Sequence, residues 1–252
     1  MRRLAIALAL GLAAAGPGAC GSAAGRPDLL VAGATSLRSA FAHYGATFSS
    51  ARVRNSFGGS DLLAAQIRQG ARPDVFASAS TTLPAALHTA GLVDAPVVFA
   101  ANRLVIALPA GASRIGSLRD LARRGVTIAA GSPAVPVGSY TRRVLARLPA
   151  TERSAIEANI RSSEPDVGGV VGKLTQGAVD AGFVYATDVR AASGRLRTIE
   201  LPRRLEPRVA YAAAIVRGAP HPREARAFIA GLLHGGGRQA LLEAGFEPPP
   251  SR

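Results

Sequence analysis

Short apolar runs alternate with segments of helical periodicity along most of the chain. Leu29 to Ala34 is an apolar run of strand length, and the residues after it show helical spacing, with apolar side chains at Leu37, Phe41, Tyr44 and Phe48. The next stretch repeats this order, with strands expected at 53–57 and 74–77 and helices expected at 62–69 and 83–90. Strands that alternate with helices of this length predict βαβ units and a mostly parallel sheet.

The later part of the chain continues the alternation and adds two longer apolar runs. We expect further helices at 118–124, 139–148, 167–176, 225–232 and 239–244, and further strands at 126–129 and 180–185. The longer runs, 97–108 and 208–216, are long enough to cross between two lobes. The pattern therefore favours two α/β lobes joined by two crossing strands, a design that closes about a hinge. A single doubly wound domain fits the alternation nearly as well.

The N-terminus has the layout of a secretory signal. Two arginines near the start are followed by the apolar run 4–15, which is too short to span a bilayer, and then by small residues. Cys20 is the only cysteine, and its position directly after two small residues resembles the lipobox of bacterial lipoproteins. We expect a signal peptide at 1–19, lipidation of Cys20 and a flexible tether at 20–27. An ordinary signal peptide with a chance cysteine is the alternative.

The chain is strongly basic, with a formal net charge of +14 at pH 7. Such a charge could attract nucleic acid, an anionic membrane or an anionic ligand. The basic residues are almost all arginines, scattered in ones and twos without interleaved aromatic residues, so no nucleic-acid motif is present. An arginine-covered surface is the simpler interpretation, and the charge would also steer an anion toward the protein. We expect no nucleic-acid partner.

Four segments place small or polar residues at the start of a predicted helix. They are Ala34-Thr35-Ser36, Gly58-Gly59-Ser60-Asp61, Pro136-Val137-Gly138-Ser139 and Pro165-Asp166-Val167-Gly168. A helix N-terminus offers unpaired N–H groups and a partial positive charge, which suit an anion, and Ser36 and Ser60 can add hydroxyl donors. The glycines would let the backbone approach a ligand closely. Each segment alone is better explained as an ordinary helix cap.

The order of these and neighbouring segments carries more information than any one of them. The relevant segments are 34–37 (ATSL), 56–67 (SFGGSDLLAAQI), 70–79 (GARPDVFASA), 102–106 (NRLVI), 131–140 (GSPAVPVGSY), 166–167 (DV) and 182–188 (GFVYATD). Together they resemble the motifs of the periplasmic molybdate-binding proteins of ABC importers, and the similarity covers nearly all of the chain after the tether. The resemblance implies a two-lobe periplasmic-binding-protein-like α/β fold of type II, with mixed sheets flanked by helices and two crossover strands as the hinge. We expect lobe one to contain 28–104 and 209–252, and lobe two to contain 105–208.

The resemblance also implies a set of ligand positions. Ser36 and Ser60 would each give a hydroxyl and a backbone N–H, Val137 and Val167 would give backbone N–H groups, and Tyr185 would give its phenolic hydroxyl. These neutral donors suit a fully deprotonated oxyanion, because such an ion only accepts hydrogen bonds. Hydrogen phosphate is disfavoured, because its own proton would find no acceptor. Sulfate also only accepts hydrogen bonds. The size of the pocket would have to separate sulfate from molybdate, and the sequence does not give that size.

The function implied is binding and delivery without a chemical reaction. We expect a monomeric exported protein, anchored through Cys20 at the outer face of the membrane or in the periplasm, that captures molybdate or tungstate and delivers it to the membrane permease of an ABC importer, with no further cofactor. A binder of sulfate or another oxyanion is the alternative within this class. A secreted hydrolase that uses Ser36 or Ser60 is the alternative from another class, and it lacks a histidine in any of the four segments. A ligand-sensing module of a regulator is opposed by the export signal.

Overall fold

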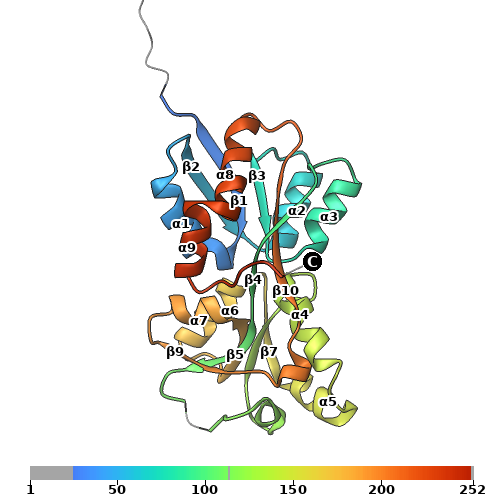
Figure 1. The fold of residues 1–252 in the computed structure, drawn as a ribbon. Coiled ribbons are helices and arrows are strands. Elements are labelled where there is room, and N and C mark those ends of the chain that lie inside the picture. The colour runs from blue at the N-terminus through green and yellow to red at the C-terminus, as the bar shows by residue number, and fades with distance from the viewer. Residues whose placement is uncertain (1–24, 113, 251–252) are drawn as a thin grey trace, which may run out of the picture.

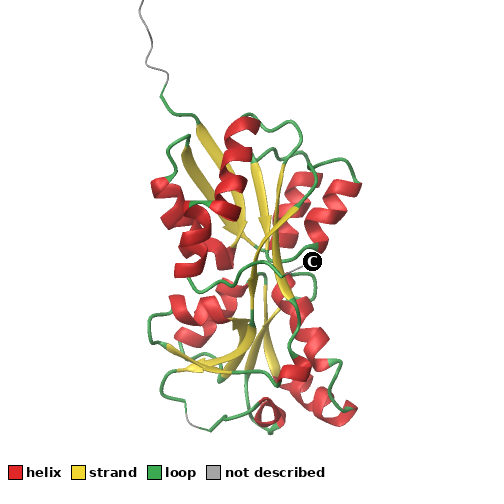
Figure 2. Ribbon diagram, in the orientation of Figure 1, coloured by secondary structure: helices red, strands yellow, loops and turns green. Residues whose placement is uncertain are grey.

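The computed structural model describes residues 25–112 and 114–250, which form two lobes stacked along the long axis of the molecule (Figure 1). Each lobe is built on a five-stranded sheet flanked by helices (Figure 2). This arrangement confirms the two-lobe α/β fold with mixed sheets and excludes a single doubly wound domain. The predicted signal peptide, Cys20 and the first part of the predicted tether lie outside the described residues.

Lobe one combines the first part of the chain with its C-terminal part. Its elements are β1 (Asp28–Ala34), η1 (Thr35–Leu37), α1 (Arg38–Thr47), β2 (Arg52–Gly58), α2 (Ser60–Arg68), β3 (Val75–Ser78), α3 (Thr82–Thr89), β4 (Val97–Asn102), β10 (Val209–Ile215), α8 (Pro222–His234) and α9 (Gly236–Glu243). The strand order is β2-β1-β3-β10-β4. β1 is parallel to β2 and β3, whereas β10 is antiparallel to β3 and β4, so the sheet is mixed rather than mostly parallel.

Lobe two is formed by the middle of the chain. Its elements are β5 (Leu104–Pro109), η2 (Leu118–Ala122), β6 (Ile128–Gly131), α4 (Pro136–Leu145), α5 (Ala150–Asn159), β7 (Ile160–Glu164), α6 (Val167–Thr175), β8 (Ala181–Tyr185), α7 (Ala186–Ala191), β9 (Leu196–Ile199) and η3 (Arg203–Leu205). The strand order is β7-β6-β8-β5-β9, with β6 parallel to β7 and β8, and β5 antiparallel to β8 and β9.

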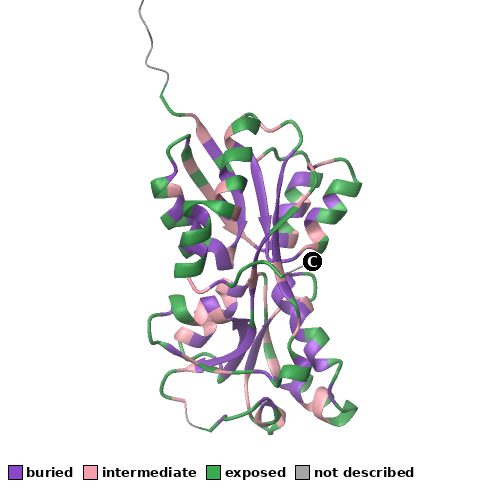
Figure 3. Cartoon of the chain, in the orientation of Figure 1, coloured by how far each residue is buried: buried purple, intermediate pink, exposed green. Residues whose placement is uncertain are grey.

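The core of lobe one lies on both faces of its sheet. In β1, Leu29 and Val31 belong to the apolar cluster that contains Phe41 and Phe228, whereas Ala32 belongs to the cluster that contains Ile67. This alternation is the two-residue period of a strand that is buried on both sides. Buried residues accordingly follow the sheets through both lobes, and exposed residues cover the outer helix surfaces (Figure 3). Within the described ranges, no helix has both the length and the apolar character that crossing a bilayer requires.

The two lobes are joined where the chain passes between their sheets. The apolar run predicted as one crossing strand is divided at Arg103 into β4, which pairs with β10 in lobe one, and β5, which pairs with β8 and β9 in lobe two. The prediction of a single strand was wrong, because at Arg103 the backbone N–H bonds to the Asn102 side chain at 2.9 Å and the strand changes partners. The Arg103 guanidinium pairs with Glu200 at 2.6 Å and with Glu247 at 3.1 Å. It therefore links the crossing to the segment after β9, which leads back to lobe one, and to the segment after α9.

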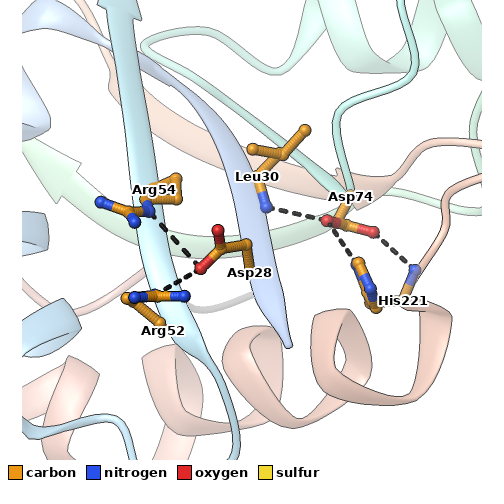
Figure 4. Close-up of polar contacts among 6 residues, drawn as sticks. All are labelled: Asp28, Leu30, Arg52, Arg54, Asp74 and His221. Atoms are coloured by element: carbon orange, nitrogen blue, oxygen red, sulfur yellow. Dashed lines mark hydrogen bonds and ion pairs between the residues drawn. The ribbon is translucent and has the colours of Figure 1, made fainter. Parts of the chain in front are cut away.

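A buried carboxylate holds the end of lobe one that is remote from lobe two. Asp74 is 0% exposed, and it accepts hydrogen bonds from the backbone N–H groups of Leu30 at 2.8 Å and His221 at 2.7 Å (Figure 4). The neighbouring Asp28 pairs with Arg52 and Arg54 of the adjacent strand. Because buried carboxylates require hydrogen-bond donors, Asp74 joins β1, β3 and the start of α8 into one unit.

Candidate functional site

A small cavity lies between the lobes, and all five predicted ligand residues line it. Ser36 and Ser60 come from lobe one, and Val137, Val167 and Tyr185 come from lobe two. The cavity has a volume of about 20 Å³. A single water molecule needs roughly 10–15 Å³, so the cavity suits a very small ligand. Larger hollows elsewhere on the surface include at most one of these five residues, Ser36.

The parallel strands of lobe one bring the two serines together. Ala34 at the end of β1 pairs in register with Gly58 at the end of β2. Ser36 and Ser60 each follow two residues later, in the first turn of η1 and of α2. Since parallel strands end at the same edge of a sheet, this register places both serines at the edge that faces lobe two. They are nearly buried, at 8% and 1% exposed.

Lobe two contributes two helix N-termini and the end of a strand. Val137 is the second residue of α4, Val167 is the first residue of α6, and Tyr185 ends β8. N–H groups in the first turn of a helix have no acceptor within the helix, and the helix dipole gives this end a partial positive charge. The cavity therefore receives backbone donors from the starts of α4 and α6, opposite those of lobe one.

The Tyr185 hydroxyl is buried at the cavity without a partner. The side chain is 1% exposed, and no hydrogen-bond partner for its hydroxyl is found among the described residues. The ring is held between Tyr140 and Tyr211, with centroid distances of 6.4 and 5.9 Å. Burial raises the pKa of Tyr185 well above 10, so the phenol remains a neutral donor. A buried unpaired hydroxyl is destabilising by about 1–3 kcal/mol, which favours a ligand as its partner.

Both serine hydroxyls already form a hydrogen bond to another group of lobe one. The Ala79 backbone N–H donates to Ser60 Oγ at 3.1 Å, and the Tyr211 hydroxyl lies 2.8 Å from Ser36 Oγ. Ala79 follows β3, the third parallel strand of lobe one. Sequence reasoning missed Tyr211, because its place in an apolar run marks it only as a core residue.

Asp166 is the one charged residue that lines the cavity in the described part of the chain. It caps α6, with Oδ1 accepting from the Gly169 N–H at 3.1 Å, and its Oδ2 accepts from the Thr35 hydroxyl at 3.0 Å across the gap between the lobes. Both carboxylate oxygens therefore have donors already, and the Thr35–Asp166 bond ties lobe one to lobe two. Asp166 belongs to one of the predicted helix-start motifs, but its bond to Thr35 was not predicted from the sequence.

Two glycines of the predicted motifs allow close contact between the lobes. A Cβ on Gly59 of lobe one would lie 2.5 Å from the Pro165 carbonyl oxygen of lobe two, and a Cβ on Gly168 of lobe two would lie 2.8 Å from the Thr35 side chain. Carbon atoms do not approach so closely without displacement. We expected these glycines to let the backbone approach a ligand, and the structure shows that they also let the two lobes approach each other.

Comparison with known proteins places these features in a family. The model of the bacterial extracellular solute-binding protein family matches residues 29–247. The chain is 35% identical over 235 residues to the molybdate-binding protein ModA of Mycobacterium tuberculosis, covering 91% of this chain and 88% of that protein.

Solved structures share the fold. The periplasmic molybdate-binding protein of Azotobacter vinelandii superposes with a TM-score of 0.79 at 22% identity, covering 89% of this chain and 100% of that one. The sulfate-binding protein SubI of Mycobacterium tuberculosis gives a TM-score of 0.78 at 17% identity, covering 88% and 87%.

Proposed function

This chain belongs to the family of bacterial extracellular solute-binding proteins, and from that membership we propose that it binds molybdate or tungstate between its lobes for delivery to an ABC importer. The observation that carries the proposal is the convergence of neutral donors from both lobes on one small cavity that contains the unpaired Tyr185 hydroxyl. The close relationship to a molybdate-binding protein supports the choice of ion.

The donor set matches a dianion that only accepts hydrogen bonds. Ser36 and Ser60 would each supply a hydroxyl and an N–H, Val137 and Val167 an N–H, and Tyr185 its hydroxyl. Hydrogen bonds to a charged group contribute roughly 1.5–3 kcal/mol each. This number of donors would offset desolvation and ordering and leave a dissociation constant on the order of micromolar to nanomolar.

The site disfavours an anion that carries a proton. Hydrogen phosphate needs an acceptor for its proton. The one carboxylate at the cavity within the described residues, Asp166, is held by one bond on each oxygen, from the Gly169 N–H and the Thr35 hydroxyl, and we propose that these bonds keep it turned away from the ligand. Sulfate is the relevant competitor, because it also only accepts and is smaller than molybdate. A hydrolase reading has no support, because among the described residues no histidine lines the cavity to act as a base for either serine.

Delivery would take place at the outer face of the membrane. We propose that Cys20 carries a lipid anchor, that the segment after it acts as a tether, and that a monomer presents the closed lobes to the permease. The family is one of extracellular binding proteins, which agrees with this location.

A thermal-unfolding panel of the mature protein with molybdate, tungstate, sulfate and phosphate tests the proposal. A ligand at about 1,000 times its dissociation constant adds roughly 4 kcal/mol of stability. For a chain of this size, that corresponds to a rise in Tm of about 8–16 °C. We expect this rise with molybdate and tungstate, a smaller one with equal sulfate and the smallest with phosphate. A rise with sulfate as large as with molybdate, or no rise with molybdate, would overturn the proposal.

A further inference from the structure

A buried chain of polar groups stands behind the Ser36 hydroxyl. Tyr211 Oη lies 2.8 Å from Ser36 Oγ, and Asn102 Nδ2 lies 3.4 Å from Tyr211 Oη and 2.9 Å from Thr187 Oγ1. All four side chains are buried. Asn102 ends β4 and Tyr211 lies in β10, so these polar groups lie on two paired strands of lobe one that are next to the crossings between the lobes.

The donors and acceptors in this chain can be assigned from its ends. The Asn102 carbonyl oxygen accepts from the Arg103 N–H at 2.9 Å, which fixes the amide and turns its NH₂ group toward Thr187 and Tyr211. An NH₂ group only donates, so Tyr211 Oη accepts from Asn102. The Tyr211 proton then has Ser36 Oγ as its acceptor, and no other acceptor is found for it among the described residues. Burial raises the pKa of Tyr211 well above 10, which keeps this proton in place.

The direction of these hydrogen bonds determines whether the Ser36 hydroxyl donates to a ligand or accepts from it. Because Ser36 Oγ accepts from Tyr211, its own proton is free to turn into the cavity that it lines. The Ala79 N–H acts on Ser60 Oγ in the same way. We propose that Tyr211, oriented by Asn102, is a positioning residue that fixes the Ser36 hydroxyl as a donor and thereby makes the site reject anions that carry a proton.

The inference rests on the proposed function in one respect, namely that the ligand is a small oxyanion. Ser36, Asn102 and Tyr211 all belong to lobe one, so the donor is set before the lobes close, which lowers the ordering needed on binding. Without the Tyr211 hydroxyl, the lone pair of Ser36 Oγ that accepts the Tyr211 proton would be open, and no described residue would fix the rotation of the serine hydroxyl. The serine could then rotate and accept the proton of hydrogen phosphate, so discrimination against that ion would fall.

The test compares Tyr211→Phe with Tyr44→Phe. Tyr211→Phe keeps the ring that packs on Tyr185 and removes only the hydroxyl. Tyr44 is also a buried tyrosine of lobe one, and its hydroxyl donates to the Phe228 carbonyl at 3.2 Å, away from the cavity. Calorimetry at pH 8 measures the dissociation constants of molybdate and inorganic phosphate for the wild type and both variants, with thermal unfolding as the check on folding.

We expect Tyr211→Phe to narrow the phosphate-to-molybdate ratio of dissociation constants by tenfold or more, about 1.4 kcal/mol. Tyr44→Phe should leave this ratio within about threefold of the wild type, about 0.7 kcal/mol. In a Ser36→Ala background, Tyr211→Phe should no longer change the ratio, because the two residues act as a unit.

Three results would overturn the inference: an unchanged ratio in Tyr211→Phe, an equal change in Tyr44→Phe, or an undiminished effect in the Ser36→Ala background. Weaker binding of both ions by the same factor is a case of the first result, because the ratio is unchanged, and it shows a structural role only. If the wild type binds sulfate instead of molybdate, the proposed function fails, and the phosphate-to-sulfate ratio then gives the same test of Tyr211.

Discussion

At the scale of single residues, removal of the Tyr185 hydroxyl should affect ligand affinity and folding stability differently. This hydroxyl is buried and has no partner among the described residues, so it does not stabilise the free protein. We expect Tyr185→Phe to raise the free energy of unfolding of the ligand-free protein by about 1–3 kcal/mol, because the buried unpaired hydroxyl is removed. Molybdate should bind about 10–100 times more weakly, because one charge-assisted hydrogen bond is lost. Urea unfolding and calorimetry measure the two quantities, and unchanged affinity would remove Tyr185 from the site.

Asp188 gives a second prediction at this scale. Burial raises its pKa to about 7 from an ordinary 3.8, the charge of Asp166 adds to the rise, and the bond from the Tyr185 N–H opposes it. Because the raised pKa means that the folded state favours the protonated Asp188 carboxyl, the protein is most stable, as far as this group is concerned, below about pH 4. This contribution to the free energy of unfolding is lost as pH rises through about 7. Asp188→Asn cannot ionise, and its amide oxygen can still accept from Tyr185.

The Tm of Asp188→Asn relative to wild type should therefore increase between pH 5 and pH 8, by about 2–4 °C for each kcal/mol of ionisation penalty. Thermal unfolding of the ligand-free proteins at both pH values measures the difference. A difference that stays constant or shrinks toward pH 8 would contradict the assignment.

Sequence could identify the residues at the cavity only where a motif marks them. Ser36, Ser60, Val137 and Val167 stand at helix starts, and Tyr185 ends a strand within a recognisable segment, so the family resemblance could point to each. The residues that hydrogen-bond to this set or link the lobes beside it cannot be paired from any motif. Tyr211 is 175 positions from Ser36, and Asp166 is 131 positions from Thr35, so only the folded chain brings these pairs together.

At the scale of elements, the contact between the start of α2 and the loop before α6 limits how the lobes meet. Gly59→Ala would place a Cβ 2.5 Å from the Pro165 carbonyl oxygen, whereas a Cβ on the adjacent Gly58 would meet only the Leu63 side chain at 3.8 Å. We expect Gly59→Ala to weaken molybdate binding at least about tenfold, because the lobes cannot close fully, and to leave the free protein folded.

Gly58→Ala is the matched control and should change the affinity by less than about threefold, since 3.8 Å is an ordinary van der Waals contact. Calorimetry compares the two variants. X-ray scattering should show compaction on adding molybdate for Gly58→Ala and less compaction for Gly59→Ala. Equal affinities for the two variants would show that this contact does not control closure.

Sequence patterns predicted the buried elements better than the exposed ones. The apolar strands β1, β3, β6, β8 and β10 were all expected near their observed positions. β2, whose residues are exposed or half-buried, was also expected. No element was expected over α5, β7, α7 or β9. β7, with the sequence IRSSE, lies at the edge of its sheet with half-buried and exposed residues in alternation, and α7 has only six residues. Elements that bury little apolar surface leave a weak pattern.

At the scale of the whole molecule, two lobes contribute complementary halves of one donor set. The serines of lobe one and the helix N-termini and tyrosine of lobe two meet only when the lobes are in contact, as the Thr35–Asp166 bond and the Gly59 and Gly168 contacts show here. Sequence could predict the two lobes and the residues that line the cavity, but not the size of the cavity or the fit between the lobes, because both depend on packing across the whole interface. Binding and closure are therefore expected to be one event.

The most direct test of this account is a crystal structure of the protein with molybdate, with the metal located by its anomalous scattering. The account predicts one molybdenum peak in the cavity, with its oxygens about 2.7–3.2 Å from the backbone N–H groups of Ser36, Ser60, Val137 and Val167 and bonded to the hydroxyl of Tyr185. A peak elsewhere, or a molybdate held by arginine side chains outside the cavity, would contradict it.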